Sequence, residues 1–410
     1  MNAKFILMMT ISFVCFALII KERRSRAQFH ALSNRNTADF NEAPIVDKNA
    51  DVDRIEQETQ WYCGPACAAM VLSRFEVDVS QNEAYKKIHD EKRFEVEKLY
   101  SDPLGLKKYI SSSLANSSSF IPEVVVATDF STLVNKIYHS ISLAGMPCPT
   151  LVFEGAHWII IDTVRSIKRT GALDEIIGVF IENPSAGKPP SSYVSIEELK
   201  TRYIKPNKWG KTWHGALVSI AANDDGKEND TAVVILDTST PFNPVATHLA
   251  GRPFSENDAL KLALANLTAH GFSDTAEIFG GGAPVTVPLR ILDEGKNEAF
   301  WIIPIDATAN KNFQNFVYSA IDEGTGRLLE ISHMQNYLNI FNDTEVEEIV
   351  ERAKPGTHLR VEAGYFWTDS YYNMSRFNVY RKVSIDGVTF YVTWNGEIVS
   401  KLLENPEFGG

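Results

Sequence analysis

Apolar positions divide the chain into two globular stretches that are separated by polar segments. In the first stretch, from residue 55 to about 222, apolar side chains recur every three to four positions over 63–75, which predicts a helix. Similar patterns predict a helix over 130–143, strands over 149–154, 157–164 and 178–182, a helix over 194–203 and a strand over 216–221. Because helices precede strands, we expect an α+β domain with an antiparallel sheet.

The second stretch shows the same order, with a helix first and strands afterwards. Ser255 and Asp258 form a capping pattern before an apolar helix over 259–269. Strands are predicted over 285–292, 299–305, 316–322 and 327–331, a helix over 345–353, and aromatic-rich strands over 365–367, 377–385 and 388–394. The dipeptides Asp386-Gly387 and Asn395-Gly396 predict hairpin turns.

Polar segments suggest how the chain is divided. Residues 28–52 show no sustained period and are interpreted as a tether, and residues 223–230 are charged and rich in turn formers. We expect a targeting segment (1–27), a linker (28–52), an α+β domain (53–222), a linker (223–240), a helix-plus-sheet domain (241–335) and a second α+β unit (336–410). The last two could be diverged copies of one unit.

The N-terminus carries an apolar run over residues 5–20, preceded by Lys4. A membrane-spanning helix needs roughly 20 apolar residues, and a basic residue before a shorter run is typical of a signal peptide. Small residues at Ser25 and Ala27 suit a cleavage site, whereas the basic residues after the run would suit a retained span that leaves the globular part in the cytoplasm. We expect export to the periplasm or the exterior, by cleavage or with 5–20 as a membrane tether.

Composition excludes several classes of protein. The 410 residues are 44% apolar and 22% charged, as in ordinary globular proteins. The net charge of −12 disfavours a nucleic-acid partner, because phosphate binding needs a positive surface. Four cysteines are too few for a disulfide scaffold, and without a second cysteine pair or a close histidine pair we expect no metal and no cofactor. The oligomeric state stays open.

The candidate chemistry centres on Cys63, at the predicted start of a helix. The positive end of a helix dipole lowers a thiol pKa, and Pro65 is tolerated in a first turn. Gly64 would leave room for a substrate backbone. The Cys63 N–H and the side chain of an upstream glutamine, Gln57 or Gln60, could bind the oxyanion of an acyl-transfer intermediate.

A nucleophilic thiol also needs a base, and His157 is the strongest candidate. It follows small residues at the start of a predicted strand, and Asn183 ends a later strand where its amide could orient the imidazole. Asp162 is an alternative orienting group and His214 an alternative base. Cys67 and Cys148 are interpreted as packing residues.

This order of residues resembles the papain-like cysteine peptidases, and most closely the bacteriocin-leader-processing, C39-like group. Their motifs place a glutamine six residues before Cys-Gly, followed by a histidine strand and an Asp-Pro or Asn-Pro. The resemblance covers about 53–222 and implies that Gln57 is the oxyanion donor, Cys63 the nucleophile, His157 the base and Asn183 the third member. The 26 residues from His157 to Asn183 exceed the usual gap, and a hairpin extension over 165–175 would account for them.

The C-terminal half resembles PepSY-type domains through the helix over 259–269 and the ending 317–326, an aspartate followed by a Thr-Gly turn and an apolar strand. The resemblance implies an inhibitory, recruiting or supporting role beside a peptidase. The sequence therefore predicts a thiol-dependent peptidase acting on a peptide or protein. Two alternatives stay open: a catalytically degenerate binding protein, and an acyl transferase, transglutaminase-like or ligase-like, that uses the same residues.

Overall fold

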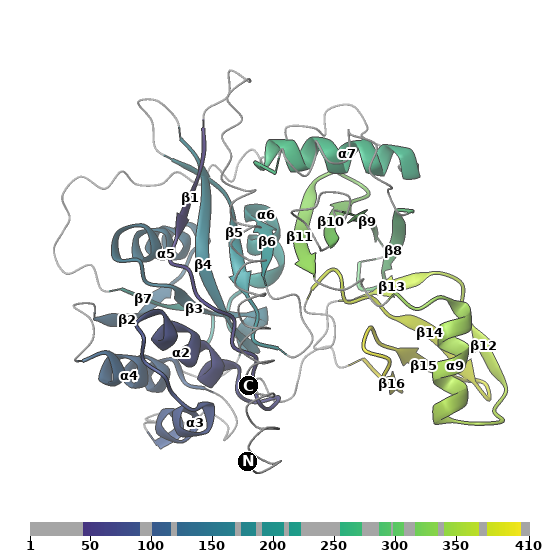
Figure 1. Cartoon of the computed structure of the whole chain (residues 1–410), viewed down its shortest axis with the longest axis horizontal. Helices are drawn as coiled ribbons and strands as arrows, with labels where there is room; N and C mark the ends of the chain where they lie inside the picture. The colour runs from purple at the N-terminus through teal and green to yellow at the C-terminus, as the bar shows by residue number, and fades with distance from the viewer. Residues whose placement is uncertain are drawn as a thin grey trace, which may run out of the picture.

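The computed structural model places most of both predicted globular stretches (Figure 1). It describes residues 44–90, 101–115, 121–168, 174–185, 191–208, 213–222, 255–272, 287–296, 298–306, 316–334, 340–368 and 375–402. The apolar run at 5–20, the linker at 223–240 and the glycine-rich loop at 280–282 lie outside these residues. In the described part of the chain, no helix is long and apolar enough to cross a membrane.

The first half is a sheet with helices on both faces (Figure 1). Its strands are β1 (Ile45–Asn49), β2 (Pro122–Ala127), β3 (Cys148–Val152), β4 (His157–Ile167), β5 (Glu175–Glu182), β6 (Ser192–Ser195) and β7 (Leu217–Ala222). Its helices are α2 (Cys63–Arg74), α3 (Gln81–Asp90), α4 (Pro103–Leu114), α5 (Phe130–Ala144) and α6 (Ile196–Glu198), with short turns η1 (Phe153–Gly155) and η2 (Leu199–Tyr203). Helix α5 covers one face, and α2 and α4 cover the other.

Strand β4 runs through the centre of this half, and this position explains the apolar run from Trp158 to Ile161. Ile159 and Ile161 pack in the cluster under α5, whereas Trp158 and Ile160 pack against α2. A strand covered on both faces carries apolar residues at every position. Helix α2 is buried from its first residue through Leu72, so the one-sided helix predicted from periodicity is instead surrounded by protein.

In its described residues, the C-terminal half adds two units, each with one helix followed by four antiparallel strands. The first contains α7 (Glu256–Ala269), β8 (Leu289–Asp293), β9 (Glu298–Asp306), β10 (Phe316–Asp322) and β11 (Leu328–Met334). The second contains α9 (Asp343–Ala353), β12 (Leu359–Val361), β14 (Arg381–Ile385), β15 (Val388–Val392) and β16 (Ile398–Val399). The intervening β13 (Tyr365–Trp367) leaves this second sheet and pairs in parallel with β8.

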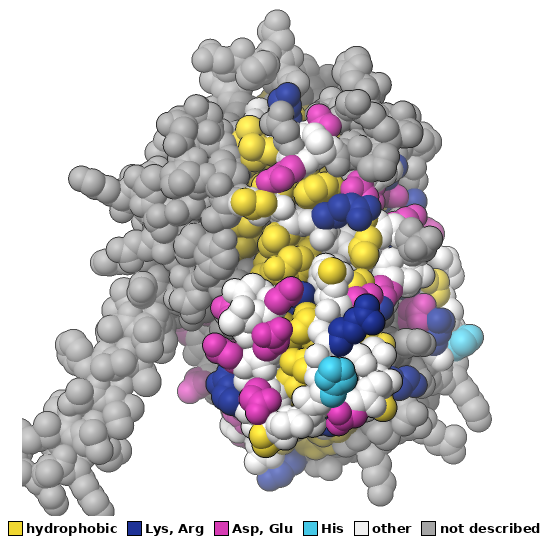
Figure 2. Space-filling model, turned by 90° about the vertical axis from the view of Figure 1, so that its right-hand side faces the viewer, with side chains coloured by type: hydrophobic (Ala, Val, Ile, Leu, Met, Phe, Trp, Pro, Cys, Tyr) yellow, Lys and Arg dark blue, Asp and Glu magenta, His cyan; other side chains and the backbone are white. Residues whose placement is uncertain are grey.

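The two halves share one continuous sheet because β11 pairs with β6. Its path is β13-β8-β9-β10-β11-β6-β5-β4-β3-β7-β2, with β1 added along β4. Helix α7 packs on β9, β10 and β11 and reaches Phe180 and Tyr193 of the first half. Figure 2, which shows the face formed by the C-terminal half, has apolar side chains running down it between charged ones.

Most predicted elements are present, and the differences have local causes. The β4–β5 hairpin pairs Ile167 with Glu175 and confirms the predicted hairpin extension. Segment 45–49, interpreted as part of a tether, forms β1, which pairs with β4. It was not predicted as a strand because its sequence is short and largely polar. The predicted helix over 194–203 begins only at Ile196, after the strand residues that pair with β11. Helices α3 and α4 and strand β2 were not predicted.

A buried arginine joins β4 to both β1 and the C-terminal half. The guanidinium of Arg165 binds both carboxylate oxygens of Asp47 at 2.7 Å and donates to the carbonyl oxygen of His270 at 2.6 Å. It also lies against the ring of Phe272, 4.5 Å from the ring centroid. The imidazole Nδ1 of His270 lies 2.7 Å from the hydroxyl of Tyr193, which itself donates to a backbone carbonyl, so Nδ1 carries the proton.

Burial, assisted by the nearby Arg165, lowers the pKa of His270 to about 3. An unfolded histidine takes up a proton near pH 6.5, so between about pH 6.5 and pH 3 the unfolded chain binds a proton that the folded chain does not. We expect the free energy of unfolding to decrease as the pH is lowered from about 6.5 to 3. This group contributes up to about 1.4 kcal/mol per pH unit. Denaturant unfolding of His270→Gln at several pH values should show a shallower slope than the parent.

The exposed His214 offers a matched control, since His214→Gln removes a histidine from the surface. Its slope should stay parallel to that of the parent chain. If His270→Gln kept the parent slope, the buried neutral imidazole would not be the source of the pH dependence.

Candidate active site

Cys63 is the first residue of α2, and its sulfur lies against the start of β4. The backbone N–H of Trp158 donates to the Cys63 sulfur at 3.4 Å. Tyr62 provides no side-chain cap, so no capping side chain occupies the N–H groups of the first turn. Pro65 lies in that turn, as predicted, and the first helical bond runs from the Ala66 N–H to the Tyr62 carbonyl at 2.8 Å.

His157 begins β4 and is bonded to Asn183, just beyond the end of β5. The imidazole Nε2 lies 3.0 Å from the Asn183 Oδ1, which also accepts the backbone N–H of Ser185 at 3.0 Å. Because the Ser185 N–H can only donate, Oδ1 is the end of the amide that faces the ring, and Nε2 carries the hydrogen. This tautomer leaves Nδ1 as the basic nitrogen.

The turn before His157 has an unusual backbone. Phe153, Glu154 and Gly155 all have positive φ, of 52°, 60° and 94°. This conformation costs on the order of 1–3 kcal/mol for each residue other than glycine, and it persists only where the surroundings enforce it. A Cβ on Gly155 would meet the Asn207 side chain at 2.1 Å, so the space beside the base is used by the protein itself. Lys208 forms an ion pair with Glu154 at 2.6 Å.

Gln57 lies in the segment before α2, and its backbone is bonded to the loop that carries Asn183. The Gln57 N–H donates to the Pro184 carbonyl at 2.8 Å. Its side-chain nitrogen donates to the Thr59 carbonyl at 2.9 Å, which leaves a second N–H on the same amide. Gln60, the other glutamine considered from the sequence, is exposed.

Two residues that the sequence did not single out hold this segment in place. The Arg54 guanidinium donates to the carbonyls of Asn183 and Ser185, both at 2.7 Å. The buried amide of Gln81, at the start of α3, donates to the Glu56 carbonyl at 2.7 Å and accepts the Glu58 N–H at 3.0 Å. Both residues contact groups far away in sequence, which no local motif reveals.

The Cys63 thiol is fully buried, and this reverses the prediction of a lowered pKa. Burial raises the pKa of Cys63 to about 12, although the N–H groups of Trp158, Gly64 and Cys63 act in the opposite direction. The prediction was wrong because desolvation of a thiolate outweighs the backbone dipoles here. The sulfur in this structure is therefore a neutral thiol.

The remaining candidates take other places. Cys67 and Cys148 are buried free thiols within the hydrophobic core, as predicted. His214 is exposed, with Nδ1 lying 3.3 Å from the Lys208 carbonyl. Asp162 is buried further along β4. Of the groups considered for orienting the imidazole, the one bonded to His157 Nε2 is Asn183.

Comparison with known proteins finds a family match within the first half of the chain. Residues 49–203 match the Peptidase_C39 like family. The match covers less than half of the chain, and over this region the chain is similar to cysteine peptidases of the C39-like kind. Among solved structures, the chain is similar to a double glycine motif protease from an AMS/PCAT transporter in complex with the leader peptide. The two share 15% identity, with a TM-score of 0.26, over 43% of this chain and 94% of that one. No curated protein matches significantly.

Gly64 gives the first test, because the space beside it is filled by protein rather than left for a substrate. A Cβ at this position would lie 2.3 Å from both the Cβ and the Oγ of Ser101. We expect Gly64→Ala to lower the free energy of unfolding by about 1–3 kcal/mol through overpacking. Adding Ser101→Gly should restore part of the loss in a double-mutant cycle measured by denaturant unfolding, with Ser101→Gly alone as the control. Unchanged stability in Gly64→Ala would contradict this packing.

The raised thiol pKa gives a second test. Below a pKa of about 12 the thiolate fraction rises tenfold per pH unit. The rate of iodoacetamide labelling of Cys63 should therefore keep rising up to at least pH 10. Free cysteine, measured in parallel, should level off near its own pKa of about 8.5. Labelling of Cys63 that levelled off below pH 8 would show a preformed thiolate and sink the prediction, and Cys63→Ala identifies the labelled residue.

Proposed function

We propose that the protein cleaves peptide bonds through an acyl-enzyme formed on Cys63, with His157 as general base and acid and Asn183 orienting the imidazole. The observation that carries the proposal is the 3.0 Å bond between His157 Nε2 and Asn183 Oδ1. The residue that follows His157, Trp158, donates its N–H to the Cys63 sulfur, so the nucleophile and the base meet at the start of β4.

Acylation starts from the neutral thiol. His157 Nδ1 accepts the thiol proton as the sulfur attacks the scissile carbonyl, because a buried thiolate is too costly to exist beforehand. The resulting imidazolium is stabilised by the Asn183 Oδ1, which keeps its bond to Nε2–H. The proton then passes to the leaving amine, and the peptide bond breaks.

The tetrahedral oxyanion needs hydrogen-bond donors in a fixed position. We assign this role to the Cys63 N–H and the free N–H of the Gln57 side-chain amide. Arg54 and Gln81 support Gln57 indirectly by fixing the backbone on either side of it. Water then attacks the thioester with His157 as the base, which releases the second product and restores the thiol.

We further propose an exported protein with a peptide or protein substrate. The support is the sequence alone: an apolar run at 5–20 and small residues at Ser25 and Ala27. Residues 241–335 are proposed as a PepSY-like domain and 336–410 as its diverged repeat. What supports the repeat is the shared order of one helix and four antiparallel strands, with a capping box at Ser255 and another at Asn342.

The central test is substitution of the nucleophile in the full chain, assayed against a library of fluorogenic peptides. Cys63→Ala should reduce turnover by more than about 10³-fold, since the covalent route is lost. Asn183→Ala should lower kcat on the order of 10²-fold, because the imidazole loses its orientation. Cys67→Ala, one helical turn away, is the matched control and should retain turnover. Full activity in Cys63→Ala would refute the proposal.

A further inference from the structure

An arginine at the junction of the two halves is surrounded by aromatic rings. The guanidinium carbon of Arg202, in η2, lies 5.5 Å from the ring centroid of Phe153, 4.8 Å from that of Tyr203 and 4.9 Å from that of Trp367. Phe153 and Tyr203 belong to the peptidase half, whereas Trp367 belongs to β13 of the C-terminal half. Arg202 and Trp367 are almost completely buried, with exposed fractions of 2% and 1%.

Carboxylates from both halves fix the position of the guanidinium. Arg202 Nη1 lies 3.5 Å from the Glu198 carboxylate of its own half and 3.8 Å from that of Glu330 on β11. Glu330 is held in turn by the Ser375 hydroxyl at 2.7 Å and the Arg376 N–H at 3.0 Å. The C-terminal half thus contributes two of the contacts that hold Arg202, those with Glu330 and Trp367.

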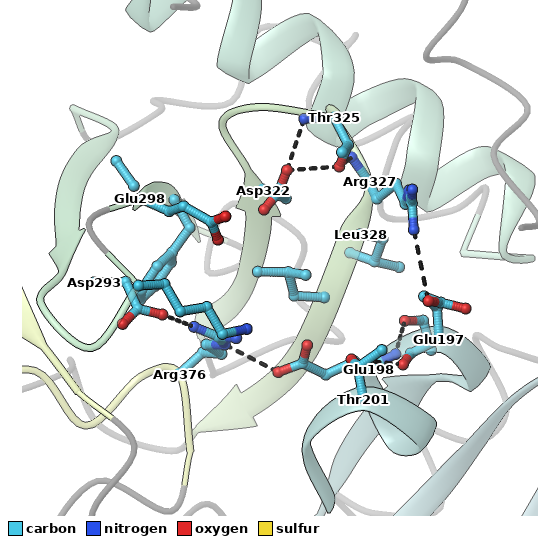
Figure 3. A pocket seen from close by; sticks show the side chains of 15 residues that line it. Glu197, Glu198, Thr201, Asp293, Glu298, Asp322, Thr325, Arg327, Leu328 and Arg376 are labelled. Carbon is cyan, nitrogen blue, oxygen red and sulfur yellow. Dashed lines mark hydrogen bonds and ion pairs between the residues drawn. The ribbon is translucent and has the colours of Figure 1, made fainter. Parts of the chain in front are cut away.

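Arg376 completes the cluster from the side of the C-terminal half. It binds Glu198 at 2.9 Å and Asp293 at 3.1 Å, and its guanidinium carbon lies 4.1 Å from the Trp367 ring centroid. Figure 3 shows Glu198 and Arg376 meeting across the junction, where they form one wall of a cavity of about 160 Å³. Away from Arg376, Arg202 contacts the rings of Phe153 and Tyr203.

Phe153 connects this cluster to the active site. It is the first of three consecutive residues with positive φ, and His157 follows two residues after the last of them. Its ring packs on Tyr203, 5.1 Å between centroids, and on Arg202. A bulky side chain takes up a left-handed backbone only where its surroundings impose it, and these two contacts restrain the Phe153 ring.

We infer that the C-terminal half positions the general base of the peptidase. Trp367 and Arg202 are the positioning residues: they hold Phe153, and Phe153 holds the turn that precedes His157. The inference rests on the proposed role of His157. Loss of the Trp367 ring would free Arg202 on one side, let Phe153 relax toward negative φ, and shift the start of β4 relative to Cys63.

The experiment compares Trp367→Ala with Trp367→Phe in the full chain. Trp367→Ala should lower kcat on the order of tenfold with KM changed less than about twofold, because the base is misplaced while substrate contacts remain. Trp367→Phe keeps a ring face over the guanidinium and should restore most of the loss. In ¹⁵N-histidine NMR spectra, assigned with His157→Gln, the Nε2–H tautomer signal of His157 should shift or broaden in Trp367→Ala alone.

Phe272→Ala is the matched control, because Phe272 is equally buried and also bridges the two halves, at Phe180 and Tyr193. It should lower stability while leaving kcat and the His157 signal unchanged. If Trp367→Ala fails to fold, Arg202→Lys tests the same contact, since it retains the charge but not the planar stacking surface.

Two outcomes would overturn the inference: a parental His157 signal and kcat in Trp367→Ala, or equal losses in Phe272→Ala. The NMR measurement does not require turnover. A His157 signal that responds to Trp367 in a protein without peptidase activity would therefore reject the proposed function and keep the coupling.

Discussion

Two of the buried guanidinium groups at the junction, Arg202 and Arg376, impose the constraint on which the arrangement of the halves depends. A charge removed from water must be paired, and breaking a buried pair by removing one partner costs about 3–5 kcal/mol. Burial alone would raise the pKa of Glu198, yet Arg376 and then Arg202 lower it, so this carboxylate is ionised. Burial raises the pKa of Glu330 on β11. The carboxylates that pair with Arg202 and Arg376 come from both halves.

Local signals explain the part of the fold that the sequence predicted. The capping box at Ser255 begins α7, the left-handed pair Asp386-Gly387 turns β14 into β15, and the apolar run after His157 forms the doubly covered strand β4. Each of these depends on neighbours within a few residues. The pairing of β6 with β11 has no such signal, because Ser192 contacts Ser332 across 140 residues. The polar strand β1 escaped prediction because its main partner, Arg165, is itself a buried charge.

The candidate site likewise has a part that the sequence predicted and a part that depends on distant residues. Cys63 and His157 were identified from spacing and residue type, and the structure brings Asn183 to His157 and the Gln57 backbone to the loop that carries Asn183. Properties that depend on the surrounding protein could not be predicted from the sequence. The thiol pKa follows from the protein packed around α2, and the need for glycine at position 64 follows from Ser101, which reaches it from another segment.

The continuous sheet also bears on the order in which the chain can fold. Residues up to Ala222 leave the ribosome before β11 exists, so the backbone edge of β6 on that side has no partner at that stage. An open strand edge invites pairing with other chains. Serines at 191, 192 and 195 make this edge polar, and it is only four residues long, both of which reduce that hazard. Tyr193 of this strand packs in the same cluster as residues of α7, so part of its packing comes from the second half. The second half therefore closes a strand edge that synthesis leaves open, because β11 pairs with β6.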